Sequence, residues 1–228
     1  GWSDQGLLVD VALHFGTLLA VTYYFRSEIV QMFQPHHFSS AQTLLHSPIG
    51  IITIATVPIV IVGGVFNEFI EQNLRSPSII AVASIFFGIL LYFADLKRAK
   101  KDEVLELTLL LGLLIGLSQI LALIPGTSRS GITITMALFL GLSRVEALKF
   151  SFMLAIPVIS AATILQSIEL FNTQLIGINF LHLFLGVFIS FIIAFLTIRW
   201  FIALVNRIGM LPFVIYRIFL GLFIFIAL

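Results

Sequence analysis

The most regular feature of the chain is a series of long hydrophobic stretches separated by short polar segments. A helix needs about 20 mostly apolar residues to cross the hydrocarbon core of a bilayer. Seven stretches reach or approach that length, at residues 7–25, 48–66, 78–94, 104–124, 147–166, 178–198 and 210–228. The pattern therefore predicts an all-α, polytopic integral membrane protein, with residues 1–228 forming a single transmembrane domain.

An eighth apolar stretch, residues 131–142, is shorter than the others. As a helix it is about 18 Å long, which is too short to cross a bilayer alone. It directly follows a polar interruption, so we expect it to fold back beside the stretch at 104–124.

Composition supports the membrane class, since the chain is 60% hydrophobic and 10% charged. Soluble domains are typically about 45–50% apolar and about 25% charged. The net charge of +1 gives no overall field for nucleic acid, which we exclude as a partner. The absence of Cys excludes disulfides and thiolate metal sites.

The basic residues predict how the chain is oriented. Lys and Arg favour cytoplasmic loops. Arg129 lies in a polar interruption and Arg217 inside the last apolar stretch, which leaves ten basic residues in or near loops. Threading the apolar stretches with Arg26 on the cytoplasmic side places only Arg75 of these ten outside. The nine residues then inside are Arg26, Lys97, Arg98, Lys100, Lys101, Arg144, Lys149, Arg199 and Arg207. This orientation places the basic loop at 95–103 inside, the loops at 67–77 and 167–177 outside, and the polar interruption after residue 124 toward the outer side.

That interruption, PGTSRSG at residues 125–131, carries the candidate chemistry. Pro125 and Gly126 break the preceding helix, and irregular backbone survives in a membrane only where protein or water surrounds it. Ser128 or Ser130 can cap a helix that begins near Gly131, whose free N–H groups and dipole favour an anion. We therefore predict a phosphate pocket here.

Side chains of the turn fit the same ligand. The planar guanidinium of Arg129 matches phosphate oxygens, and Thr133 lies one helical turn further along. Two simpler interpretations stay open: a capped, water-exposed turn, and Ser128 as a nucleophile, although no His or carboxylate lies nearby in sequence to act as its base. A P-loop is excluded, because Ile132 stands where Lys is needed. Arg217, inside the last apolar stretch, should face the bundle interior and either pair with a carboxylate or contact the ligand.

Residues 118–162 resemble the signature region of the bacterial undecaprenyl-diphosphate phosphatase family, the bacitracin-resistance BacA type. The family's PGxSRSxxT motif falls on residues 125–133 without a mismatch. The flanking pattern agrees at Gln119, Gly141, Arg144, Phe150, Ser151 and Pro157.

The resemblance implies an enzyme that removes one phosphate from a polyprenyl diphosphate lipid at the extracytoplasmic face of the bacterial cytoplasmic membrane. The product re-enters the lipid-carrier cycle of cell-wall synthesis. The implied fold has inverted repeats with re-entrant helix hairpins, one of them at about 104–142. We expect catalytic roles for Arg129, Ser128 and Thr133. The expected substrate-binding residues are Gly126, Thr127, Ser130, Gly131, Gln119 and Arg217.

The resemblance also implies a divalent metal, Mg²⁺ or Ca²⁺, held by glutamates of a second, N-terminal motif. This sequence contains no such motif, so we expect the chain to be N-terminally truncated, with the metal carboxylates upstream of Gly1. The rival function is a polyprenyl-phosphate flippase or other anion transporter, since a broken helix that points its N-terminus at an anion also serves transport. The sequence leaves open whether the protein forms a homodimer.

Overall fold

The computed structural model describes residues 7–99, 106–171 and 180–228, and all regular elements in these ranges are helices. The long elements are α1 (Leu7–Tyr24), α4 (Pro48–Asn73), α5 (Pro77–Ala99), α8 (Arg144–Phe171) and α9 (Phe180–Ile208). The shorter ones are α2 (Arg26–Met32), η1 (Pro35–Phe38), α3 (Ala41–His46), α6 (Leu109–Gln119), η2 (Ile120–Leu123), α7 (Arg129–Phe139) and α10 (Leu211–Ile226).

The polytopic membrane class is confirmed. Four described helices, α4, α5, α8 and α9, are long and apolar enough to cross a bilayer, and the bent pair α1–α2 makes a fifth if it counts as one span. Two predicted spans are shorter than expected. Thr108 accepts a hydrogen bond from the N–H of Leu111, so α6 starts only at Leu109, while α10 has 16 residues.

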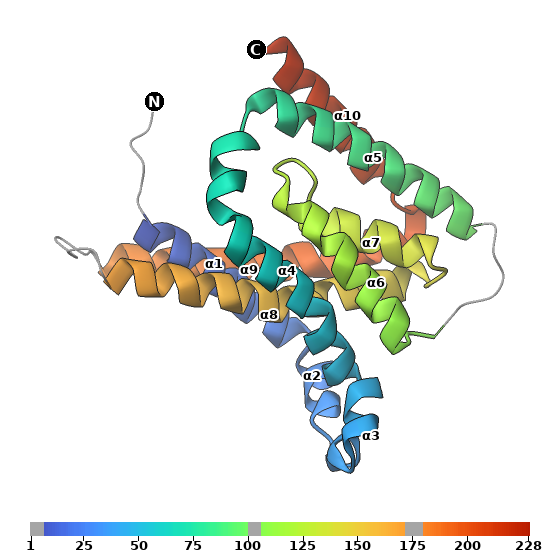
Figure 1. The fold of residues 1–228 in the computed structure, drawn as a ribbon. Helices are drawn as coiled ribbons and strands as arrows, with labels where there is room; N and C mark the ends of the chain where they lie inside the picture. Colours follow the sequence, from blue (N-terminus) through green and yellow to red (C-terminus); the bar gives the residue numbers. More distant parts are fainter. Residues whose placement is uncertain (1–6, 100–105, 172–179) are drawn as a thin grey trace.

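The helices form two groups with a helix pair between them (Figure 1). α1 packs along α8 and α9, and α5 packs along α10. α6 and α7 contact each other, and α7 contacts both α5 and α8. The segment predicted as a hairpin thus lies between the two groups. Its re-entrant placement in a bilayer and the inverted repeats stay predictions.

Small residues allow the closest helix approaches, as is common in membrane bundles. A Cβ at Gly116 of α6 would collide with the backbone of Ala55 in α4. A Cβ at Gly221 of α10 would collide with α5 at Ala81 and Ile85. The second contact sets the register of α10 against α5, which matters for the site.

The basic segment at 95–103 differs from its prediction as a loop. α5 continues through Ala99, and Asp95 and Arg98 are buried in its last turns. Helix continues there because both side chains find partners on neighbouring segments, as described below. Lys100, Lys101 and residues 172–177, which entered the orientation argument, lie outside the described residues.

Candidate phosphate site

The turn between η2 and α7 has an unusual backbone. Gly126 has φ +92°, and a Cβ there would collide with the backbone of Ile80 in α5. Ser128 is the one non-glycine residue in the described ranges with positive φ, at φ 67° and ψ 116°. Such conformations cost of order 1–3 kcal/mol and gather at functional sites. The strain at Ser128 therefore marks the turn as a candidate site.

Ser128 also begins the helix. Its hydroxyl accepts a hydrogen bond from the N–H of Gly131 at 3.2 Å, so α7 starts at Arg129, two residues earlier than predicted, and Ser128 rather than Ser130 is the cap. The N–H groups of Arg129 and Ser130 fall in the first turn, where a helix has no internal partners for them. The positive end of the helix dipole thus lies at the turn.

Two donors from other helices hold the turn in place. Arg217 of α10 donates from Nη2 to the Gly126 carbonyl oxygen at 2.7 Å, and Ser84 of α5 donates to the same oxygen at 3.2 Å. Arg217 is 8% exposed, which confirms the prediction that it faces the bundle interior. The sequence left open a carboxylate or the ligand as the partner of Arg217. Its Nη2 contacts a backbone carbonyl oxygen and not a carboxylate.

A cavity of about 430 Å³ lies beside the turn, between α5, α7, α9 and α10. Five of the predicted site residues line it: Gly126, Ser128, Ser130, Gly131 and Arg217. Gln119, Thr127, Arg129 and Thr133 are not part of its lining. The structure thus divides the predicted site into a cavity wall and a set of residues behind or beside it.

Unpaired polar atoms gather around the turn. Among the described residues, seven buried side-chain nitrogen and oxygen atoms have no hydrogen-bond partner, and five of them belong to Gln119, Thr127, Arg129 and Arg217. Gln119 and Thr127 are fully buried. Leaving a buried donor or acceptor unpaired costs about 1–3 kcal/mol. This concentration is therefore typical of a place that a polar ligand or water completes.

Thr133 is placed differently from its expected role. Its hydroxyl lies 3.0 Å from the Arg129 carbonyl, 3.2 Å from the Ser130 carbonyl and 2.7 Å from the hydroxyl of Ser151 in α8. Thr133 is 1% exposed. Through these contacts Thr133 holds the first turn of α7 against α8, so in this structure it positions the start of the helix.

The charges around the turn favour an anion. Arg217 lines the cavity, Arg129 opens α7, and no carboxylate is among the cavity-lining residues. Within the described ranges, no group of three or more His, Asp or Glu side chains is arranged to hold a metal ion. These residues fit phosphate oxygens and do not fit a divalent cation, so we derive no step through a metal.

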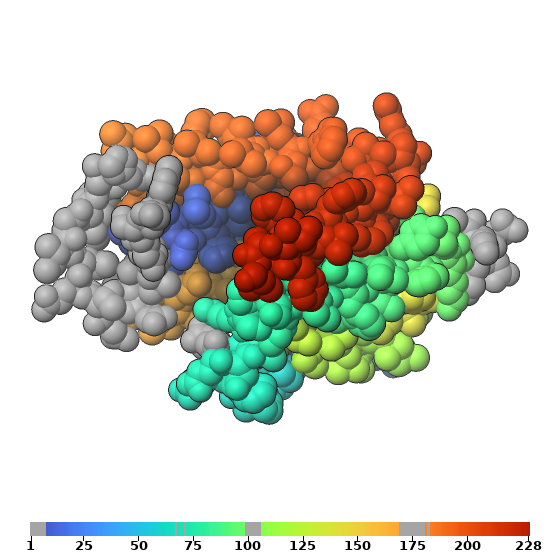
Figure 2. Space-filling view, turned by 90° about the horizontal axis from the view of Figure 1, so that it is seen from above, coloured from blue at the N-terminus to red at the C-terminus, as the bar shows by residue number. Residues whose placement is uncertain are grey.

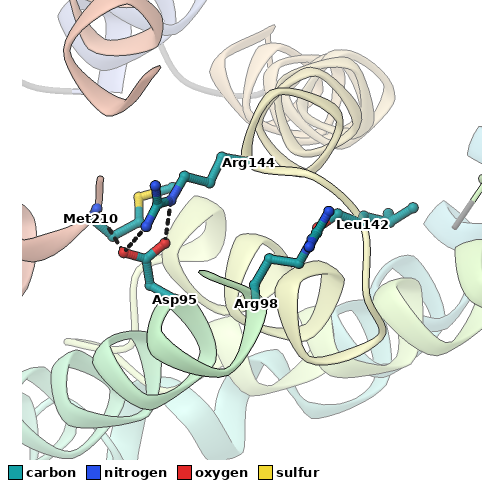
Figure 3. Close-up of polar contacts among 5 residues, drawn as sticks. All are labelled: Asp95, Arg98, Leu142, Arg144 and Met210. Carbon is teal, nitrogen blue, oxygen red and sulfur yellow. Dashed lines mark hydrogen bonds and ion pairs between the residues drawn. The ribbon is translucent and has the colours of Figure 1, made fainter. Parts of the chain in front are cut away.

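A second polar cluster joins the last turns of α5 to the start of α8 and to Met210, which lines the cavity (Figure 3). Arg144, which begins α8, donates to both carboxylate oxygens of Asp95 at 2.6 and 2.9 Å, and the N–H of Met210 donates to Asp95 Oδ2 at 3.1 Å. Arg98 donates to the Leu142 carbonyl at 2.9 Å. We call Asp95, Arg144 and Met210 the clasp.

Sequence analysis missed Ser84 and the clasp as a unit, and it named Ser151 and Arg144 as matches to the family's flanking pattern, without a contact. Ser84 and Ser151 are single hydroxyls inside apolar helices, and their spacing does not show which of them contacts the turn or α7. Asp95 could have been noticed in the sequence, because it is an acidic residue at the start of the basic segment 95–103. An acidic residue at that position neutralises a basic side chain from elsewhere in the fold, here Arg144.

The fold defines a polytopic membrane protein, and the candidate anion site lies at a break between two short helices. The family model described as bacitracin resistance protein BacA matches residues 1–223, and the chain belongs to this family. It is 46% identical to an undecaprenyl-diphosphatase of Saccharophagus degradans, over 97% of this chain and 83% of that protein. An undecaprenyl-diphosphatase of Campylobacter concisus is also 46% identical, over 98% of this chain and 85% of its own length. One of Teredinibacter turnerae is 44% identical, over 100% and 87%.

Proposed function

We propose that the protein is a membrane hydrolase that converts undecaprenyl diphosphate to undecaprenyl phosphate and phosphate. The observation that carries the proposal is the set of unpaired buried polar atoms around the strained turn, in a chain whose relatives are named undecaprenyl-diphosphatase. The guanidinium group of Arg217, which lines the cavity, and that of Arg129, at the start of α7, gain partners when a diphosphate binds.

Phosphoryl transfer depends mainly on positioning and on neutralising charge. Arg129 and the first N–H groups of α7 bind the phosphoryl oxygens, while the Ser128 and Ser130 hydroxyls donate hydrogen bonds from the cavity wall. Arg217 and Ser84 fix the turn through the Gly126 carbonyl, and Thr133 fixes α7 to α8 through Ser151.

The family resemblance supports a location in the bacterial cytoplasmic membrane, which is part of the same proposal. The charge count supports an orientation with the turn toward the extracytoplasmic side. The proposal includes a divalent cation, Mg²⁺ or Ca²⁺, only through family resemblance, since the described residues do not supply its ligands.

The test is phosphate release from undecaprenyl diphosphate by the purified full-length protein in detergent. Arg129→Lys keeps the charge but loses the two-pronged contact, so we expect turnover to fall by about 10²–10³, as when an oxyanion donor is removed. Arg199→Lys, at an exposed position of α9, is the matched control and should leave turnover unchanged. Near-normal turnover in Arg129→Lys would contradict the proposed role of this arginine.

A transporter for polyprenyl phosphates or other anions is the alternative, and the names of the relatives do not favour it. A protein that moves the lipid across sealed vesicles without releasing phosphate would replace the hydrolase proposal with this one.

A further inference from the structure

A single buried carboxylate joins three segments of the fold. Asp95, in the last turns of α5, accepts hydrogen bonds from Nε and Nη2 of Arg144 and from the N–H of Met210 (Figure 3). Arg144 begins α8, and Met210 directly precedes α10. Asp95 and Met210 are both buried, and hydrogen bonds to an ionised group are stronger than neutral ones. The clasp is therefore a strong, directional connection between α5 and the start of α10.

The residue before Met210 fits closely against the clasp. Gly209 has φ +74°, a conformation that residues with a side chain rarely adopt. A Cβ at Gly209 would lie 3.0 Å from Asp95 Oδ2 and 3.0 Å from Arg144 Nη2. The link between α9 and α10 thus lies directly against the ion pair, where the N–H of Met210 reaches the carboxylate.

Two further contacts hold α10 along α5 (Figures 1 and 2). A Cβ at Gly88 of α5 would lie 3.3 Å from the Cβ of Arg217, and Gly221 packs against Ile85. Between the clasp and the Gly88 contact the chain moves seven residues back along α5 and seven forward along α10, as antiparallel helices do. Arg217 therefore lies about two helical turns, roughly 10 Å, from the end of α10 that the clasp holds.

The same end of α5 also holds the end of α7. Arg98, three residues after Asp95, donates from Nε to the carbonyl oxygen of Leu142 at 2.9 Å. Leu142 is buried in the link between α7 and α8. The nearby ends of α7 and α10 are thus both tied to α5. The bond from Arg217 to the Gly126 carbonyl oxygen joins the two helices again, just before the start of α7.

We propose that Asp95 and Arg144 are positioning residues for the phosphate site. The clasp fixes where α10 lies against α5, and α10 presents the Arg217 guanidinium to the turn, where Nη2 lies 2.7 Å from the Gly126 carbonyl oxygen. A shift of about 1 Å would stretch this bond beyond the usual limit of about 3.2 Å. The expected effect on phosphate release rests on the proposed function, whereas the effect on the turn does not.

A double-mutant cycle separates this positioning role from a general loss of stability. Its variants of the full-length protein are Asp95→Ala, Arg217→Ala and the two combined. Glu146→Ala is the matched control. Glu146 and Ser143 form a reciprocal cap at the same start of α8, and its hydrogen bonds involve neither Asp95 nor Met210.

Two quantities are measured for each folded variant. The first is kcat for phosphate release from undecaprenyl diphosphate, at a temperature well below each Tm, so that unfolding does not contribute. The second is amide hydrogen exchange of residues 124–131 without substrate, which reports on local opening of the turn. The N–H of Thr127, bonded to the Ile124 carbonyl oxygen at 3.1 Å, belongs to this segment.

We expect Asp95→Ala to lower kcat about tenfold, since a misplacement of about 1 Å can cost up to 10² in rate. Exchange in the turn should become about tenfold faster, the worth of a hydrogen bond to a charged group. In the Arg217→Ala background Asp95→Ala should change neither quantity further, because the side chain through which the clasp acts is gone. Glu146→Ala should leave both unchanged. If Asp95→Ala does not fold, Arg144→Lys, which loses the two-pronged contact, takes its place with the same pattern.

Three results overturn the inference: unchanged exchange in the turn of the folded clasp variant, effects that multiply in the double variant as independent losses do, or equal effects in Glu146→Ala. If the wild type releases no phosphate while exchange follows the expected pattern, the role of the clasp is supported and the hydrolase function is contradicted. The two proposals therefore fail in different ways.

Discussion

Replacing Ser128 with Gly tests whether the turn stores strain. Its φ of 67° is unfavourable for any side chain with a Cβ, at a cost of order 1–3 kcal/mol, whereas Gly adopts positive φ freely. Two smaller costs oppose this release of strain. The lost cap costs a few tenths of a kcal/mol, and the flexibility of Gly in the unfolded chain costs about 0.5–1 kcal/mol. We expect Ser128→Gly to be about 1 kcal/mol more stable than the wild type.

Ser128→Ala separates strain from capping. It keeps the Cβ and its strain but loses the hydrogen bond to the N–H of Gly131, which costs about 1 kcal/mol. The two variants should therefore differ by about 2 kcal/mol. For a chain of this length that corresponds to a difference of about 4–8 °C in Tm.

Thermal unfolding in detergent measures this difference, and Ser40 supplies the matched control. Ser40 caps α3 through the N–H of Thr43, at an unstrained φ of −152°, so Ser40→Gly should be slightly less stable than the wild type. Ser128→Gly and Ser128→Ala should both lose up to about tenfold in phosphate release, the worth of one hydrogen bond. A Ser128→Gly variant no more stable than Ser128→Ala would refute the strain argument.

Three further predictions concern the surrounding framework. Arg217→Lys keeps a charge but loses the planar donor to the turn's carbonyl oxygen, so phosphate release should fall at least about tenfold, and unchanged turnover would contradict this. Asp95→Ala leaves Arg144 without its carboxylate partner and should lower the free energy of unfolding by about 3 kcal/mol. This value is at the lower end for buried pairs, because the Arg144 side chain is 34% exposed. A loss below about 1 kcal/mol in thermal unfolding would count against the clasp. Single cysteines at Arg75 and Arg207 should be labelled by an impermeant thiol reagent from outside and inside intact cells, respectively, and the reverse pattern would invert the proposed orientation.

The membrane fold was predictable because its signal is local. Runs of about 20 apolar residues specify spanning helices whatever their neighbours are. α6 was predicted to begin at residue 104 and begins at Leu109, because hydropathy does not reveal that the Thr108 hydroxyl caps a helix there. The start of α10 lies within one residue of its prediction, but the sequence does not show that Met210, just before it, gives its N–H to Asp95, 115 residues away.

The turn itself was also predictable, because Pro125 and Gly126 interrupt a helix within the chain's own sequence. What the sequence does not contain is the direction in which each side chain points. Thr133 shares a helix face with Arg129, yet its hydroxyl bonds to Ser151 of α8. Helical spacing limits which residues share a face, and the packing of a neighbouring helix decides which of them reach the ligand.

Arg217 shows how the two halves of the site depend on each other. Gly221, one turn further along α10, packs against the backbone of α5 and so fixes how far α10 slides along that helix. In this register Nη2 of Arg217 donates to the Gly126 carbonyl oxygen, while Nη1 has no hydrogen-bond partner among the described residues and lies against Gly131 at the start of α7. In the proposed function this side chain therefore both holds the turn and offers a donor to the ligand. A buried arginine with no carboxylate partner among the described residues is costly in a membrane protein, and in the proposed function the bound diphosphate supplies the negative charge that offsets this cost.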